Sequence, residues 1–363
     1  MLTNRKQEDG NKPVRLNHSF GGIADLSPSY FAMVMATGIV SVAAHLYNYT
    51  LLSWSLFYIN IIAYIVICVL FLGRFIFYKK EFISDFRDDE KNMGFLSFVA
   101  ASCILGSQFV LIADNYQIGI YFLILGLASG IIFTYLLLAI LIEKRNKPSL
   151  QAINGSWLLL VVAMQAVSVL SAQLEAFLPF PQDEVLFFSL MLFLCGSIFY
   201  IIIITLIVYR LIFFKLQAEN FSPSYWINMG ADAITVLAGS TLILYAHKWQ
   251  VLSDLLSFLK GYTLLFWAIG TWWIPLIVIL GLWRHITKKI PLRYHSQYWE
   301  IIFPLGMYTV CTVYLAQAID LPFLKGISSV FVFFAIAGWT MVFISLLYSM
   351  AFKAKQKGDL KSN

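Results

Sequence analysis

The chain has 363 residues, of which 60% are hydrophobic and 12% charged, and its formal net charge is +6. An ordinary globular domain is about 25% charged, so this composition excludes a single water-soluble core and leaves no room for a sizeable soluble domain. The positive residues alternate with apolar stretches instead of gathering on one face, which argues against nucleic-acid binding.

Residues 1–26 are polar and of mixed charge. They lack the basic start, short apolar core and small-residue cleavage site of a signal peptide, so we predict a cytoplasmic N-terminal tail. A membrane-spanning helix needs roughly 20 apolar residues. Ten stretches qualify: Ser29–Leu46, Ser53–Tyr78, Phe95–Ala113, Gln117–Ile142, Ser156–Leu174, Val185–Phe214, Tyr225–Ala246, Tyr262–Trp283, Tyr298–Ile319 and Ile327–Phe352. They predict an all-α integral membrane protein, with a transmembrane domain over 27–352 and a cytoplasmic tail over 353–363.

The cations set the predicted orientation. All 25 Lys and Arg residues except Lys248, Lys260 and Lys325 fall in the two tails or in every second loop, with the helix ends beside them. Positive residues mark the cytoplasmic side of membrane proteins. We therefore predict a multi-pass protein of the cell (inner) membrane with both termini in the cytoplasm.

The odd-numbered spans differ from the even-numbered ones. The even spans are long and almost purely apolar, whereas the odd spans carry small and polar residues near mid-membrane. Polar groups in hydrocarbon normally face a bundle interior or a water-filled path. We predict five tandem helical hairpins, with an inner ring of five odd helices inside an outer ring of five even ones. A weak internal repeat fits this plan if the equivalent positions are Gly38, Gly106, Ala166, Gly230 and Gly306.

The odd spans also supply candidate ligands for an anion. No Lys or Arg lies deep in any odd span, so an anion would meet only hydroxyls, amides and backbone N–H groups at helix bends. The alternative for each polar side chain is a hydrogen bond between helices. The candidates for anion contact or pore lining are Thr37, Gly38, Gln108, Gln165, Asn228, Gly230, Gly306 and Thr309.

Asp232 and Glu300 are the acids that lie most clearly within odd spans. Burial of a carboxyl group favours its neutral form, so either residue is a candidate for coupling proton entry to anion entry. The alternatives are exposure at the membrane interface for Glu300 and a helix-end hydrogen bond for Asp232.

Three segments carry a family resemblance. They are Pro28–Ile39, Trp157–Gln165 and Trp299–Thr309, the last of which contains the phrase Phe-Pro-Leu-Gly-Met-Tyr-Thr. With ten spans in the same order, the chain from about Leu26 to Phe352 resembles the tellurite-resistance/dicarboxylate transporter family. That family includes the bacterial TehA protein, the yeast malate and sulfite transporters and the plant slow anion channels.

The resemblance implies an anion pathway through each protomer, lined by the odd helices, in a homotrimer. It also implies that Phe303 plugs this pathway; the alternative is that Phe303 is one of 31 phenylalanines packed in an apolar interior. The expected substrates are small anions, first of all C4-dicarboxylates such as malate, carried with proton coupling. The alternatives are a passive channel for chloride or nitrate and an exporter of sulfite- or tellurite-type oxyanions.

Other classes receive little support from the sequence. The four cysteines all lie in apolar stretches, and the five histidines lie in tails, loops or helix ends, which predicts no metal site or cofactor. We expect no enzyme activity, because no nucleophile–base pair lies at a common depth. The expected partners are a small anion or dicarboxylate, membrane lipid and further copies of the chain, with no nucleic acid.

Overall fold

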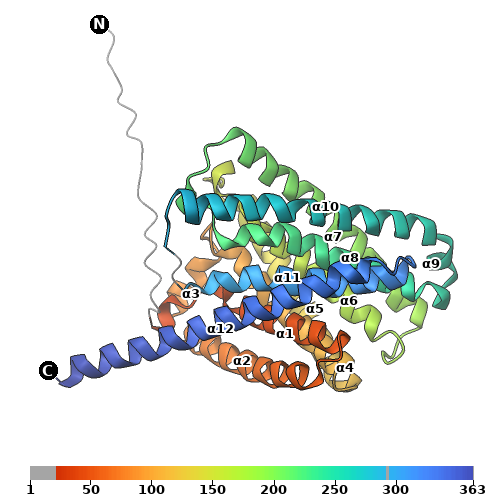
Figure 1. The fold of residues 1–363 in the computed structure, drawn as a ribbon, viewed down its shortest axis with the longest axis horizontal. Helices are drawn as coiled ribbons and strands as arrows, with labels where there is room; N and C mark the ends of the chain where they lie inside the picture. The colour runs from red at the N-terminus through yellow and green to blue at the C-terminus, as the bar shows by residue number, and fades with distance from the viewer. Residues whose placement is uncertain (1–21, 292–293, 363) are drawn as a thin grey trace, which may run out of the picture.

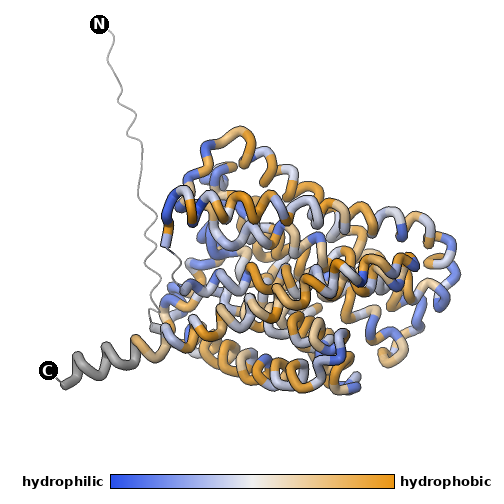
Figure 2. The backbone as a smooth tube through the Cα atoms, in the orientation of Figure 1, coloured by the Kyte–Doolittle hydropathy of each residue, from blue (hydrophilic) through white to orange (hydrophobic). Residues whose placement is uncertain are grey.

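The computed structural model describes residues 22–291 and 294–362 of the chain. The predicted N-terminal tail, apart from residues 22–26, and Arg293 therefore lie outside the described residues. The described part is helical, and ten of its helices are long and apolar enough to cross a membrane. In Figure 1 these helices run roughly along the long axis of the molecule, and in Figure 2 their apolar middles lie between hydrophilic ends.

The ten long helices fall into two groups by burial, and this confirms the predicted two-ring plan. Between 72% and 94% of an apolar 18-residue window in each odd span is buried, against 22% to 33% of the corresponding window in each even span. The inner helices are α1 (Phe31–Leu46), α4 (Leu96–Leu111), α6 (Leu159–Gln173), α8 (Ile227–Leu244) and α11 (Trp299–Ala318). The outer helices are α2 (Thr50–Phe77), α5 (Tyr116–Glu143), α7 (Gln182–Phe213), α10 (Leu256–Leu282) and α12 (Leu324–Ser362).

The inner helices form a closed ring around an axis. Along the ring, α1 packs on α4, α4 on α6, α6 on α8, α8 on α11, and α11 back on α1. Each outer helix packs on the inner helix that precedes it in the chain, so the fold consists of five hairpins in sequence. Gly126 and Gly130 of α5, which form a Gly-x-x-x-Gly sequence, face Cys103 and Val99 of α4 and allow close packing within the second hairpin.

Both ends of the described chain lie at one end of the bundle, which we call the termini end. It holds the short helix α3 (Lys79–Asp85) and the last turns of α12, whereas the short helix α9 (Gln250–Asp254) lies at the far end (Figure 1). The backbone of α12 continues as helix to Ser362, beyond the end predicted at Phe352. The residues after Phe352 are mostly Lys, Ala and Gln, which are strong helix formers.

Every inner helix begins with a short 3₁₀ turn at the termini end. Ser27, Asn154 and His295 each accept a hydrogen bond from the backbone N–H two residues later, which fixes the start of three of these turns. The five turns contact one another in a closed circle, which we call the ring of turns. They are η2 (Pro28–Tyr30), η3 (Asn92–Phe95), η5 (Gly155–Leu158), η7 (Pro223–Trp226) and η10 (Ser296–Tyr298).

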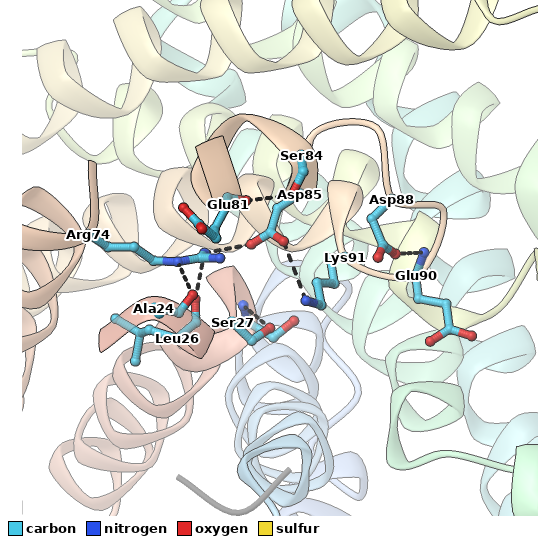
Figure 3. A network of polar contacts seen from close by, with 11 residues as sticks. Ala24, Leu26, Ser27, Arg74, Glu81, Ser84, Asp85, Asp88, Glu90 and Lys91 are labelled. Atoms are coloured by element: carbon cyan, nitrogen blue, oxygen red, sulfur yellow. Dashed lines mark hydrogen bonds and ion pairs between the residues drawn. The ribbon is translucent and has the colours of Figure 1, made fainter. Parts of the chain in front are cut away.

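Arginines at the termini ends of three outer helices anchor this ring. Arg74 donates to the carbonyls of Ala24 and Leu26 at 2.9 and 2.8 Å and pairs with Asp85 at 2.5 Å (Figure 3). Arg210 donates to the Ile153 carbonyl and the Tyr225 hydroxyl, and Arg284 donates to the Phe221 carbonyl. Leu26, Ile153 and Phe221 each directly precede the residue that starts a turn. These arginines therefore fix the backbone just before three of the turns, in addition to contributing to the excess of cations at the termini end.

Candidate functional site

The five inner helices share one register, counted from a reference residue at the start of each turn. These reference residues are Ser27, Asn154, Ser222 and His295, each directly before its turn, and Asn92, the first residue of η3. Positions five, eight, twelve and fifteen residues further on lie on one helix face, because 3.6 residues make one turn. Three of these four sets consist entirely of residues that line cavities inside the ring. The shared register therefore identifies the face that each inner helix turns toward the axis.

The first set, which we call the mouth layer, lines a cavity near the termini end. We call this cavity the termini-side cavity. The cavity measures about 10 Å³ and is also lined by Ser29, Met35 and Phe303. That volume is close to the space needed by one water molecule. The mouth layer consists of Ala32, Ser97, Leu159, Ile227 and Glu300.

A second cavity of about 20 Å³, which we call the far-side cavity, lies further along the axis. Its wall contains all residues of the third layer, which are Ile39, Ile104, Ala166, Ile234 and Met307, and all residues of the fourth layer, which are Val42, Ser107, Val169, Leu237 and Val310. Gln173 and Tyr314 line it beyond the fourth layer. The two cavities are small and separate, so the axial path is closed in this conformation.

The second set, eight residues after each reference residue, lies between these two cavities, and we call it the gate layer. Its members are Met35, Ala100, Val162, Gly230 and Phe303, and Phe303 is only 1% exposed. A Cβ atom on Gly230 would lie 3.3 Å from Cε1 of Phe303 and 2.8 Å from Cγ of Pro304. Phe303, the largest side chain of this layer, therefore packs where α8 has no side chain. Its role as a gate stays a prediction.

Glu300 lies on the axis, one helical turn before Phe303. The residue is 2% exposed and lines the termini-side cavity, so the alternative of interfacial exposure is wrong. The Ser29 hydroxyl is close enough to interact with the carboxyl group, but within the described part of the chain neither carboxylate oxygen has a hydrogen-bond partner. Among the residues that line the two cavities, Glu300 is the only Asp, Glu, Lys, Arg or His.

Three of the predicted anion contacts bind outer helices instead of lining a cavity. Thr37 accepts a hydrogen bond from Trp339 Nε1 at 2.9 Å, and Gln108 Oε1 accepts one from Asn60 Nδ2 at 2.6 Å. Gln165 Nε2 donates to the Phe193 carbonyl at 3.0 Å. These bonds match the alternative reading of hydrogen bonds between helices. The bond of Gln165 joins the two helices of the third hairpin, whereas the other two bonds join neighbouring hairpins, α1 to α12 and α4 to α2.

Thr309 is also engaged in packing. Its hydroxyl donates to the Leu305 carbonyl of its own helix at 2.9 Å, and its carbonyl accepts a hydrogen bond from Ser328 of α12 at 2.7 Å. Neither cavity is lined by Thr309. For Thr309, Thr37, Gln108 and Gln165 the direct anion contact stays a prediction. Gln108 Nε2 has no hydrogen-bond partner among the described residues, so this donor would not have to give up a bond first.

Asp232 lies off the axis, between α8 and the outer helices. Its Oδ2 accepts a hydrogen bond from Tyr200 of α7 at 2.6 Å, and its side chain packs on Gly270 of α10. Asn228 lies one turn earlier on α8, and its buried amide has no hydrogen-bond partner among the described residues. Neither side chain lines either cavity. Of the two predicted proton-coupling residues, only Glu300 is on the path.

The predicted glycine repeat aligns the five inner helices differently from the way the structure aligns them. Gly230 belongs to the gate layer, whereas a Cβ on Gly38 would meet Ile104 and Asn60, and one on Gly306 would meet Ile39 and Val40. These glycines allow close helix contacts at different heights, so they are not equivalent positions. This corrects the predicted repeat: five hairpins exist, but their common register runs through the turns.

Sequence reasoning missed most of the axial residues, including Met35, Ser97 and Met307. These side chains are apolar or small and do not stand out in a hydrophobic helix. A usable signal was present: Ser27–Tyr30 and Ser222–Tyr225 have the identical sequence Ser-Pro-Ser-Tyr. Aligning these two segments gives the correct register of α1 and α8. No group of three or more potential metal ligands occurs among the described residues.

A closed ring of five helices around an axial path, inside five further membrane-length helices, defines an integral membrane protein of the transporter or channel type. The family described as voltage-dependent anion channel matches residues 25–347. The chain belongs to this family, which confirms the resemblance that the three sequence motifs carry.

Proteins with similar sequences are described as membrane proteins or transporters, in agreement with this family. An uncharacterized membrane protein of Mycobacterium tuberculosis is 38% identical over 154 residues, which cover 42% of this chain and 77% of that protein. Two uncharacterized transporters of Methanocaldococcus jannaschii are 25% and 26% identical. The matches cover 80% and 79% of this chain, and 84% and 82% of those proteins.

Proposed function

We propose that small anions cross the membrane along the axial path and that Phe303 blocks this path in the closed conformation. The observation that carries the proposal is the packing of Phe303 against Gly230 in the gate layer, between two cavities that all five inner helices line. Movement of one aromatic side chain would join these cavities.

The lining favours singly charged anions. No Lys or Arg lines either cavity, so a permeating anion gives up hydration without meeting a fixed cation. Losing hydration costs more for a divalent than for a monovalent ion. We therefore propose that a C4-dicarboxylate such as malate passes as its singly charged form, and that monovalent inorganic anions use the same path.

Glu300 supports the proton-coupled version over a passive channel. An ionised carboxylate on the axis repels an approaching anion, whereas a protonated one donates a hydrogen bond to it. Anion passage then depends on a bound proton. A passive chloride or nitrate channel is the second candidate, and it is favoured by the apolar lining of the far-side cavity.

Proteoliposome flux measurements test the function. Wild type, Phe303→Ala and Phe266→Ala would be compared in gradients of chloride, nitrate, sulfite and malate. Phe266 is equally buried but belongs to the outer helix α10, so it controls for loss of a packed phenylalanine. We expect Phe303→Ala alone to raise anion flux. Stoichiometric, pH-dependent flux identifies a carrier and large pH-independent currents a channel; no anion movement in any variant refutes the proposal.

We further propose that the termini end faces the cytoplasm of a cell with this protein in its inner membrane, and that the protein is a homotrimer. The orientation is supported by the excess of cations at that end, and the trimer by family resemblance. Labelling from each side of sealed vesicles tests the first, and the mass of the intact assembly in detergent tests the second.

A further inference from the structure

A third cavity lies off the axis, between the first two hairpins. It measures about 340 Å³, against about 10 and 20 Å³ for the axial cavities. Seven phenylalanines line it. We call it the phenylalanine crevice; its main walls are Phe71 and Phe75 of α2, Phe82 of α3, Phe133 of α5, and the inner-helix residues Phe31 and Phe98.

The crevice opens sideways, between two outer helices. Its rim residues Leu72, Phe75 and Leu125 are 60%, 47% and 40% exposed. Both α2 and α5 are membrane-length helices whose outward faces are apolar. The medium at the opening is therefore lipid hydrocarbon and not water. An apolar cavity of this size readily takes up an apolar ligand.

The lining offers nothing to a polar ligand. Its one hydroxyl, on Tyr64, is already hydrogen-bonded to Ser102 at 2.8 Å. Its one thiol, on Cys68, is a weak hydrogen-bonding group. The occupant that fits this chemistry, in this medium, is a hydrocarbon chain.

The charges next to the crevice indicate which headgroup accompanies that chain. Asp85 pairs with Arg74 and Lys91 at 2.5 and 3.4 Å (Figure 3), and Asp89 pairs with Lys144 at 2.6 Å. In contrast, Lys79 and Lys80 at the start of α3 are exposed and form no ion pair within the described part of the chain.

We propose that the phenylalanine crevice binds one acyl chain of an anionic phospholipid, with the headgroup phosphate beside Lys79 and Lys80. Phe82 of α3 lies in the crevice, two residues from Lys80, so chain and headgroup contacts come from the same short helix. Phe31 and Phe98 form the floor of the crevice, and each is adjacent in sequence to a mouth-layer residue, Ala32 and Ser97. The bound chain supports the two inner helices where the axial path begins.

Native mass spectrometry of the full-length protein, titrated with phosphatidylglycerol or phosphatidylcholine, tests this site. Cys68→Phe fills the crevice, and Cys195→Phe makes the same change on the exposed face of α7 as a matched control. We expect wild type and Cys195→Phe to retain one tightly bound phosphatidylglycerol that Cys68→Phe loses. Replacing Lys79 and Lys80 by Gln should reduce the preference for phosphatidylglycerol over phosphatidylcholine by about fivefold per lysine.

A measurement on the unaltered protein covers the case in which Cys68→Phe does not fold. Phosphatidylglycerol should slow labelling of Cys68 by a lipid-soluble maleimide and leave labelling of Cys195 unchanged. Equal lipid retention by both phenylalanine variants, or a labelling rate of Cys68 that phosphatidylglycerol leaves unchanged, overturns the proposal. A change in the number of copies per assembly without any change in bound lipid would instead assign the crevice to contact between protomers. All these readouts are independent of anion flux.

Discussion

Phe303 of α11 and Gly230 of α8 are complementary members of one layer: the rings of Phe303 and of the adjacent Pro304 pack into the space that a side chain at position 230 would enter. A Cβ on Gly230 would lie 2.8 Å from Pro304 and 3.3 Å from Phe303. Gly230→Ala should therefore destabilise the closed packing, with a loss of about 1–3 kcal/mol in stability, a lower thermal midpoint in detergent and a raised basal anion flux. Gly281→Ala on α10, where no atom lies within 4 Å of the added carbon, is the matched control. Equal midpoints and equal flux in the two variants would contradict this account of the gate.

Glu300 is expected to make anion flux depend on pH. The carboxylate repels anions when ionised and ceases to do so when protonated, so wild-type flux should rise as the pH falls. Glu300→Gln keeps the size of the side chain and removes the charge. Its flux should be high at neutral pH and nearly flat with pH, measured in proteoliposomes buffered equally on both sides.

Asp232→Asn provides the comparison for Glu300. Asp232 is bonded to Tyr200 and lines neither cavity, so we expect its substitution to lower the thermal midpoint and to leave the pH profile of flux unchanged. A flattened profile in Asp232→Asn, together with a normal one in Glu300→Gln, would assign proton coupling to Asp232 instead.

Arg210→Met tests the anchoring of the ring of turns. The substitution keeps most of the apolar stem but leaves the Ile153 carbonyl and the Tyr225 hydroxyl without their donor. An unsatisfied buried polar group costs about 1–3 kcal/mol, so the thermal midpoint should fall. Arg145→Met removes an exposed cation from a loop at the same end and should have no effect. The anchoring role is wrong if the two variants unfold alike.

Ala166→Cys, in a background without the four native cysteines, tests the axial path. Ala166 belongs to the third layer and lines the far-side cavity. Ala166 is 3% exposed, so a small thiosulfonate should modify the cysteine slowly at best, and not from the termini end, where the gate layer closes the route. Adding Phe303→Ala should make it reactive from both sides. Reactivity from both sides with Phe303 intact would show that this residue does not close the path.

The amino-acid sequence by itself determined the number of membrane helices, their alternating direction and the division into two rings. Each of these features rests on local properties: the length of an apolar stretch, the cations at its ends, and the contrast between polar-containing and purely apolar helices. The segment around Phe303 also carried its motif in the sequence.

Tertiary structure alone decided which residues of the inner helices face the axis. An inner helix is buried on every side, so its hydropathy does not reveal its rotation, and polar residues are as useful between helices as along a path. Gln165 and Asp232 therefore face outer helices, whereas Glu300 and Met307 face the axis. The rotation of each helix is set by side-chain packing between hairpins and by the ring of turns. It brings together residues that are more than 270 positions apart in the chain, such as Ser29 and Phe303, which line the same cavity.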